Sequence, residues 1–374
     1  MKPKISALST LWALFIFNQL SLAVSSPYWV FAEMTQDCDG PSYLDYNVVP
    51  GYFKQDDPKT DDETFNYRDS FGLIERSYDI DEYLPGDISN YTQWERFTLQ
   101  VEHMNSQAPP DVQYKLIYAG RHGQGYHNLA IDTYGKEMWD CYWSLQEGDG
   151  ITSWTDPFLT PLGISQAEAV HQTWEKEMKL NIPLPEVYIV SPLRRCIMTA
   201  NHSFAELDLP ETRPFRPVIK DLCRETIGLH VCDRRSTRTV IEKFAGPRYT
   251  IEDGFVEEDL EWTRDVVESY TARNARMLRF LDSIFDVEDS PDKGYYPITT
   301  PKAATFISLT AHDGVITSIL NVTNHRPFRM ETGAVIPIFL KIERKNGVRP
   351  PMHVDPPKRA PKCPPGFKPP KHMN

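Results

Sequence analysis

Beyond its first two dozen residues, the 374-residue sequence has no run approaching the eighteen apolar residues that a membrane-spanning helix requires. It also lacks an excess of positive charge: 52 acidic and 40 basic side chains give a formal net charge of −12. No basic stripe with interleaved aromatic residues precedes the last thirty residues. We therefore expect no stable membrane span and no nucleic-acid partner. A negatively charged protein of this kind would bind an anionic ligand through a few focused arginines.

Metal-binding patterns are missing as well. The acidic residues between 56 and 63 do not have EF-hand spacing, and the arrangement Cys223-x6-His230-x-Cys232 does not have zinc spacing. No internal repeat is visible. The sequence therefore gives no reason to expect a metal or another cofactor.

The N-terminus resembles a secretory signal peptide over residues 1–25. Lys2 and Lys4 precede a mostly apolar stretch over 11–24, and small residues at 23–25 resemble a cleavage site. Three N-x-[ST] sequons, at Asn90, Asn201 and Asn321, are compatible with glycosylation on that route. We expect a secreted or secretory-pathway protein; an uncleaved signal anchor is the alternative.

Six cysteines lie beyond the signal and allow up to three disulfides, with fifteen possible pairings. The sequence does not choose among these pairings. A bridge between Cys223 and Cys232 would pin the polar segment around them, but two free or otherwise paired thiols explain the sequence equally well.

Alternation of short apolar runs with amphipathic stretches predicts an α/β domain over residues 26–344. Within it, 26–110 looks irregular, and the arginine-rich segment 228–256 looks like an inserted cap. Residues 345–374 are rich in proline and lysine, and they predict an extended, mobile tail or a ligand for a proline-recognition domain. The predicted strands are 114–119, 186–190, 216–219, 305–310 and 334–342, and the predicted helices are about 164–180, 193–207 and 257–286.

Charged residues follow several predicted strands at the points where those strands end. In an open α/β sheet this edge is where ligands usually bind. The set offers two histidines, two arginines and a carboxylate, which is the inventory that phosphoryl transfer through a histidine needs. Arginines would supply the electrostatics, so no metal is required. The stretches are Arg121-His122-Gly123, Ser191-x-x-x-Arg195, Leu222-x-Arg-Glu225 and His312-Asp313.

These signatures, in this order, resemble the histidine phosphatase superfamily, and the phosphoglycerate mutase-like branch is the nearer match. The strings from Gly120 to Asn128 and from Cys232 to Arg235 resemble phosphomutase-like phosphatases of fungi. The resemblance spans about residues 50–343. It implies a three-layer α/β/α sandwich with a mostly parallel mixed sheet.

The resemblance also implies roles for individual residues. His122 is the expected nucleophile, and Glu225 is the expected proton donor, with Asp313 as the alternative donor. Arg121, Arg195 and His312 would form the phosphate pocket, Asn128 would support it, and Gly123 would let the backbone turn. Arg234 and Arg235 in the cap could bind a second phosphate or an acidic substrate, or simply form a solvated surface.

The predicted function is hydrolysis of a small phosphomonoester through a phosphohistidine. Two alternatives stay open. A mutase would return the phosphoryl group to a bound substrate, and a non-catalytic binding protein could use the same fold. The oligomeric state is not predicted.

Overall fold

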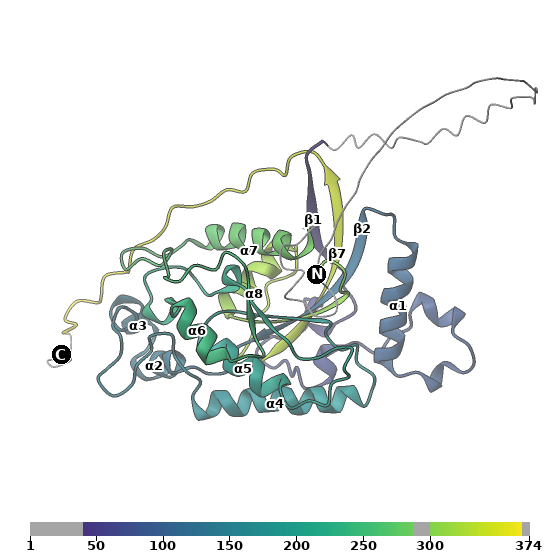
Figure 1. Ribbon diagram of the computed structural model, residues 1–374, viewed down its shortest axis with the longest axis horizontal. Helices are drawn as coiled ribbons and strands as arrows, with labels where there is room; N and C mark the ends of the chain where they lie inside the picture. Colours follow the sequence, from purple (N-terminus) through teal and green to yellow (C-terminus); the bar gives the residue numbers. More distant parts are fainter. Residues whose placement is uncertain (1–39, 287–299, 369–374) are drawn as a thin grey trace, which may run out of the picture. The chain divides into compact units, whose positions relative to one another are not determined.

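A computed structural model describes residues 40–286 and 300–368 (Figure 1). The predicted signal peptide and Cys38 lie outside the described residues. Among the described residues, no helix is both long and apolar enough to cross a membrane. The structured part contains one seven-stranded mixed sheet in the order β1-β7-β2-β6-β3-β4-β5.

Five strands, β2, β6, β3, β4 and β5, run parallel to one another, while β7 is antiparallel to both β2 and β1. This is the mostly parallel mixed sheet that the resemblance implied. The strands are β1 (Ser42–Val48), β2 (Val112–Arg121), β3 (Val187–Val190), β4 (Val218–Ile219), β5 (Thr250–Ile251), β6 (Phe306–Ala311) and β7 (Val335–Asn346).

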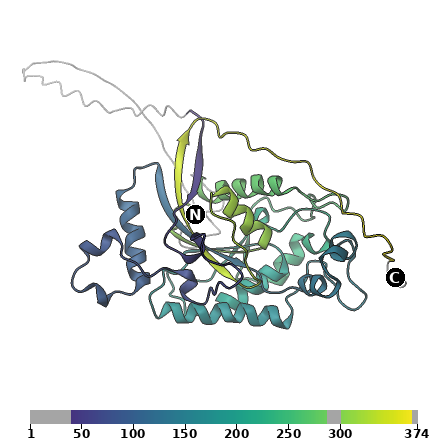
Figure 2. The same cartoon turned by 180° about the vertical axis from the view of Figure 1, so that it is seen from behind.

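Helices cover both faces of the sheet, so the three-layer prediction is confirmed (Figures 1 and 2). Alternate residues of β2 serve the two layers: Leu116 and Tyr118 pack with α1, α4 and α5, whereas Ile117 and Ala119 pack with α7 and α8. The helices are α1 (Gln93–Gln107), α2 (Tyr126–Tyr134), α3 (Lys136–Cys141), α4 (Pro161–Met178), α5 (Arg194–Phe204), α6 (Arg238–Ala245), α7 (Tyr270–Phe285) and α8 (Asp313–Val322).

The region 26–110 is more ordered than its sequence predicted. Its described part contains the edge strand β1 and the fifteen-residue helix α1. The helix begins with a capping box in which Thr92 accepts from the backbone N–H of Glu95, and the Glu95 carboxylate accepts from that of Thr92. The prediction of an irregular segment was therefore wrong here.

The predicted helix 257–286 begins thirteen residues later than expected, at Tyr270. Ser269 caps its first turn by accepting from the N–H of Ala272. The residues before Ser269 form loops instead of helical turns. The backbone carbonyls of Val256 and Glu258 in these loops accept hydrogen bonds from the Arg235 guanidinium. Because the residues before Tyr270 make these contacts, which a local pattern does not reveal, the helix starts late.

The C-terminal segment is extended, as predicted, but it is not free. In both views it runs from β7 past α7 towards α3 (Figures 1 and 2). A disulfide joins Cys363 to Cys141 at the end of α3. Lys358 pairs with Val267 through two backbone hydrogen bonds, and Asp355 accepts from the hydroxyl of Thr271. Residues 346–368 therefore form a strap across the domain, and the prediction of a mobile tail is corrected for them.

The disulfide between Cys223 and Cys232, which was one of the two possibilities for these residues, is not formed. Cys223 and Cys232 are both free and buried. The Cys223 thiol donates to the carbonyl of Lys220, and the Cys232 thiol lies 3.4 Å from the Asp233 carboxylate. Each thiol thus has a polar neighbour of its own, and neither is bonded to the other.

Candidate active site

The ends of β2, β6 and β3 and the loop after β4 bring the predicted residues to one edge of the sheet. His122 directly follows β2, and its backbone N–H donates to the carbonyl of Ala311, the last residue of β6. A cavity of about 460 Å³ opens there. Its lining includes Arg121, His122, Asn128, Glu225, Asp313, His127, Trp139, Thr226, His230, Arg273 and Gly314.

His122 is held in the orientation that a nucleophile needs. Its side chain is almost fully buried, and Nδ1 lies 2.7 Å from the carbonyl oxygen of Gly123. A carbonyl only accepts, so Nδ1 carries the proton and Nε2 keeps the lone pair. Burial, followed by the positive charge of Arg195, holds the pKa of His122 well below its ordinary value. The imidazole is therefore neutral, which is the nucleophilic form.

His312 lies beside His122, with 5.1 Å between the ring centroids. It follows β6 and precedes the first residue of α8, and its Nε2 lies 2.7 Å from the hydroxyl oxygen of Ser191. Burial, and next the charge of Arg195, also holds the pKa of His312 well below its usual value. The two imidazoles are close enough to contact one tetrahedral phosphate.

Arg195, in the first turn of α5, lies against the nucleophile. Its side chain is fully buried, and Nε donates to Nε2 of His122 over 3.3 Å. The other nitrogens donate to the carbonyl of Cys232 (2.7 Å) and to the carboxylate of Asp233 (2.9 Å). A phosphorus atom approaching Nε2 of His122 would displace the first of these contacts. The guanidinium would then face the phosphoryl oxygens.

Arg121, the last residue of β2, lies on the other side of the site. One of its Nη atoms lies 3.3 Å from the carboxylate of Asp313 and donates to the carbonyl of Met330. Its Nε is buried and has no hydrogen-bond partner among the described residues. A buried donor without a partner is costly, so this N–H is suited to an anionic ligand.

Glu225 and Asp313, the two candidate proton donors, both line the cavity, as do Asp140 and Asp233. Glu225 accepts from the backbone N–H of Thr226 (2.9 Å) and from that of Gly314 (3.4 Å). Burial acts to raise the pKa of Glu225, but Arg273 and Arg195 together with these donors hold it below its usual value. The pKa of Asp313 is raised, mainly by burial, although Arg121 opposes the shift.

Gly123 and Asn128 support the site through the backbone. A Cβ on Gly123 would lie 2.2 Å from the carbonyl oxygen of Gly163, so only glycine allows the loop after β2 to pack on the start of α4. Its N–H donates to the Thr199 hydroxyl. The Asn128 side chain accepts from the N–H of Gly125 at the start of α2, and Asn128 lines the cavity.

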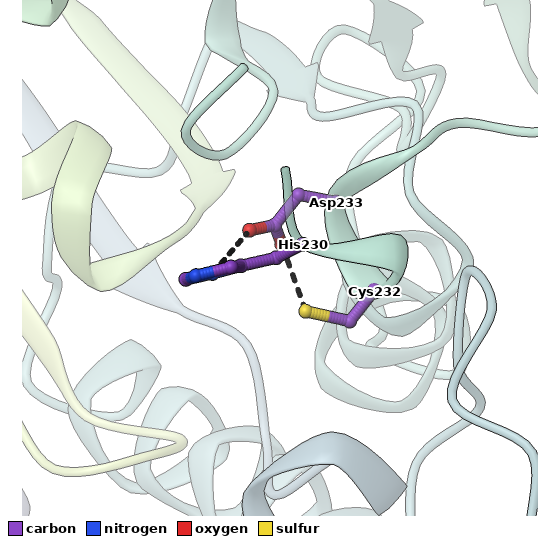
Figure 3. Close-up of side chains that lie close together, drawn as sticks. All are labelled: His230, Cys232 and Asp233. Atoms are coloured by element: carbon purple, nitrogen blue, oxygen red, sulfur yellow. Dashed lines mark hydrogen bonds and ion pairs between the residues drawn. The ribbon is translucent and has the colours of Figure 1, made fainter. Parts of the chain in front are cut away.

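His230, Cys232 and Asp233 form a cluster next to Arg195 (Figure 3). Their potential ligand atoms lie within 4.8 Å of one another, and Figure 3 shows the imidazole and the thiol both directed towards the Asp233 carboxylate. That carboxylate already pairs with the guanidinium of Arg195, whose charge repels a cation. Burial raises the pKa of the Cys232 thiol well above its usual value, which disfavours the thiolate that a metal would need. The cluster is better explained as the support of Arg195.

Arg234 and Arg235 do not reach the cavity, contrary to one of the two predictions made for them. Arg235 is buried, and its Nη2 donates to the carbonyls of Val256 and Glu258. Arg234 lies over the ring of Trp262 at 5.2 Å. Both side chains therefore hold the loops of the cap segment together, and the binding of a second phosphate by these arginines is withdrawn.

Three residues at the site were not assigned a role from the sequence. Asp233 lies within Cys232-Asp-Arg-Arg235, of which only the two arginines were considered as ligands. His127 is buried in the cavity wall, with its ring 5.5 Å from that of His122. Arg273 comes from the first turn of α7, where no local pattern marks it.

Comparison with known proteins identifies the family of this chain. A family model described as histidine phosphatase superfamily (branch 1) matches residues 117–330. The chain belongs to the histidine phosphatase superfamily. It is 48% identical over 301 residues to a protein of Arthroderma benhamiae called "Probable phosphoglycerate mutase", covering 80% of this chain and 85% of that one.

Other relatives have similar names. "Phosphomutase-like protein 3" of Candida albicans is 32% identical over 302 residues, which cover 80% of this chain and 81% of the relative. Among solved structures, a mycobacterial glucosyl-3-phosphoglycerate phosphatase aligns with a TM-score of 0.30 and 19% identity, covering 57% of this chain and 83% of that one. The superfamily membership confirms the resemblance inferred from the sequence motifs.

Proposed function

We propose that this member of the histidine phosphatase superfamily hydrolyses a small phosphomonoester through a phosphohistidine at His122. The observation that carries the proposal is the state of that side chain. It is neutral and buried, its Nδ1 is fixed by a carbonyl, and Arg195 and His312 lie beside it. The Nε–H of Arg121, which has no hydrogen-bond partner within residues 40–286 and 300–368, would add a third anion-binding group.

The chemistry would proceed in two steps. Nε2 of His122 attacks phosphorus, and the bond from phosphorus to the ester oxygen breaks while Glu225 gives that oxygen a proton. A water molecule then attacks the phosphohistidine, Glu225 takes a proton from it, and inorganic phosphate leaves as the P–N bond breaks. The arginines stabilise the charge on the transferred phosphoryl group in both steps.

Trapping the intermediate tests this proposal. Rapid quenching at alkaline pH during turnover of a phosphomonoester should reveal one added phosphoryl group on the peptide containing His122. The variant His122→Asn keeps a polar side chain of similar size and should lose about a thousandfold or more of the hydrolysis rate. Full activity in that variant would contradict the mechanism.

The identity of the proton donor is a separate test, because Glu225 and Asp313 both line the cavity. Glu225 contacts two backbone N–H groups that fix its direction, whereas Asp313 is paired with Arg121 and would be drawn away from a leaving group. We therefore expect Glu225→Gln to lower turnover by about a hundredfold or more, and Asp313→Asn to have the smaller effect. A small effect of Glu225→Gln with a large effect of Asp313→Asn would reverse the assignment.

A phosphomutase is the second candidate, and the names of two relatives favour it. A mutase must retain its phosphohistidine until a second acceptor binds. Incubation with a phosphorylated hydroxy acid separates the two activities: a hydrolase releases inorganic phosphate, whereas a mutase forms the positional isomer without net release. A non-catalytic binding protein would do neither and would form no phosphohistidine.

We further propose that the protein acts in the secretory pathway or outside the cell. The signal-like N-terminus and the sequons motivate this location, and the Cys141–Cys363 disulfide supports it because such bonds persist in oxidising compartments. Fractionation of cells expressing the full chain, with a glycosidase shift assay, tests it. Recovery of an unglycosylated protein in the cytosol would contradict it.

A further inference from the structure

Arg273 is a cation in the cavity wall that the mechanism above does not use. It lies in the first turn of α7, on the side of the cavity that holds Glu225. Its Nε donates to the Ser318 hydroxyl over 3.0 Å, and its Nη1 donates to the Thr226 hydroxyl over 2.6 Å. The Tyr270 ring lies 5.6 Å from the guanidinium. Every one of these partners is neutral.

Other partly or fully buried arginines nearby differ in this respect. Arg276, one turn further along α7, pairs with the Glu268 carboxylate, and Arg195 pairs with Asp233. Within 40–286 and 300–368, no carboxylate lies within the 4.0 Å of an ion pair with Arg273. The nearby Glu225 carboxylate interacts with the charge of Arg273 but forms no direct ion pair with it. A guanidinium that is held in place, partly desolvated and not directly paired is well suited to an anionic ligand.

Arg273 is also connected to Glu225. The Thr226 hydroxyl that accepts from Arg273 donates to the carboxylate of Glu225 over 3.1 Å. A Cβ on Gly314 would lie 2.4 Å from Oε1 of Glu225 and 2.6 Å from Nη1 of Arg273. The two charged groups therefore meet above the bare backbone of Gly314, in the cavity that His122 also lines.

We propose that Arg273 binds an anionic group carried by the leaving alcohol, so that the preferred substrates are small phosphomonoesters with a second anionic group. This inference rests on the hydrolase function proposed above. The second group can be a carboxylate or another phosphate, since a guanidinium binds both through paired N–H donors.

Binding at Arg273 would also aid the proton transfer. Although burial favours the protonated carboxyl, Arg273 and Arg195 hold the pKa of Glu225 below its usual value in the free protein. A general acid must carry a proton when the ester oxygen leaves. An anion on the Arg273 guanidinium offsets its positive charge, so Glu225 can retain the proton. A substrate without the second anion lacks this effect.

Matched pairs of substrates test the proposal. 3-Phosphoglycerate differs from glycerol 3-phosphate by a carboxylate in place of a hydroxymethyl group, and propane-1,3-diol bisphosphate differs from the monophosphate by a second phosphate. We expect the wild-type protein to have the higher kcat/KM for the member with the second anionic group, in at least one of the two pairs. Arg273→Gln should lower that preference about 10- to 100-fold, as for loss of a charge-assisted hydrogen-bond pair.

Two further variants complete the design. Arg279→Gln removes an exposed arginine from the same helix and should leave the preference unchanged. Arg273→Lys keeps the charge without the planar fork and should restore part of the preference, which excludes a general folding defect. The pair that responds identifies the second anion as carboxylate or phosphate.

The outcomes separate this inference from the proposed function. The esters without a second anionic group can be hydrolysed through His122 while the preference for a second anion is absent, or persists in Arg273→Gln. In that case only the role of Arg273 is overturned. If no ester yields phosphate or a phosphohistidine, the hydrolase function fails and the inference falls with it.

Discussion

The centre of the site and its rim are built by different means. At the centre, His122, Arg195 and His312 follow strands or begin helices at one sheet edge, and the pairing of β6 with β2 and β3 fixes their spacing. At the rim, α3 and the segment before α7 are held by links to a strap more than eighty residues away. The centre depends on local strand geometry, whereas the rim depends on a few distant cross-links.

This contrast predicts where changes will matter most. Side chains at the centre contact the reacting atoms, so their loss should affect the chemical step. Links at the rim set the shape of the cavity around the leaving group, so their loss should affect stability and substrate binding. The expected effect on the chemical step therefore decreases from the centre outwards.

Among the changes that compare centre and rim, the largest effect should come from Arg195→Lys. Lysine keeps one positive charge, but it cannot donate at once to His122, the Cys232 carbonyl and Asp233 as the planar guanidinium does. We expect kcat to fall about 10²- to 10³-fold, as for loss of a major transition-state donor. Steady-state kinetics on a phosphomonoester without a second anionic group measures this fall.

The exposed Arg248→Lys, in the cap segment, provides the matched control and should change little. A fall in kcat of less than about threefold for Arg195→Lys would mean that the centre tolerates loose geometry, and the contrast between centre and rim would then be lost.

A smaller effect is expected for Asp233→Asn, which tests whether the cap cluster serves the centre. The asparagine can still accept from Arg195 but no longer balances its charge. The pKa of His122, already depressed by burial and then by Arg195, should fall further. His122 must be neutral to attack, so activity lost as pH falls through its pKa should be lost at a lower pH. The acid limb of kcat/KM should move down, with turnover reduced about 10-fold.

An unchanged acid limb, together with normal turnover, would assign Asp233 to packing alone. Addition of zinc or a chelator should leave both the variant and the wild-type protein unaffected, because the guanidinium of Arg195 occupies the anionic side of the cluster. Zinc-dependent activity would reopen the metal interpretation.

The same contrast explains what the sequence could predict. Arg121, His122 and His312 follow apolar runs that a sheet buries on both faces, so their convergence was expected because parallel strands end at one edge of the sheet. Arg273 lies in the first turn of α7, within the predicted helix 257–286 whose start was wrong, and only packing of α7 on α8 brings it to Glu225. Its role could not be inferred from spacing.

Two structural errors have identifiable causes. The capping box at Thr92 and Glu95 was a readable signal for α1, but the acidic, aromatic composition around it favoured an irregular segment. The strap was judged mobile because proline-rich sequence builds no core of its own. Instead, a disulfide from Cys363 to Cys141, 222 residues earlier in the chain, fixes the strap to the end of α3.

The smallest effect on chemistry should come from Cys363→Ser, which releases the strap from α3. This helix carries the cavity-lining residues Lys136, Trp139 and Asp140 next to Cys141. Loss of a bond that closes so long a loop should cost about 2–4 kcal/mol of unfolding free energy. The rim would then be less ordered, so we expect KM to rise a few-fold with kcat nearly unchanged. Denaturant unfolding and steady-state kinetics measure the two effects.

Cys141→Ser breaks the same bond from the other side, so it should match Cys363→Ser, and the double variant should be no worse than either. Additive losses would mean that the cysteines act separately and that the strap does not order α3. A large fall in kcat, with KM unchanged, would contradict the separate roles of centre and rim. It would show that the distant cross-link, and not strand geometry alone, holds His122 and Arg195 in their reactive arrangement.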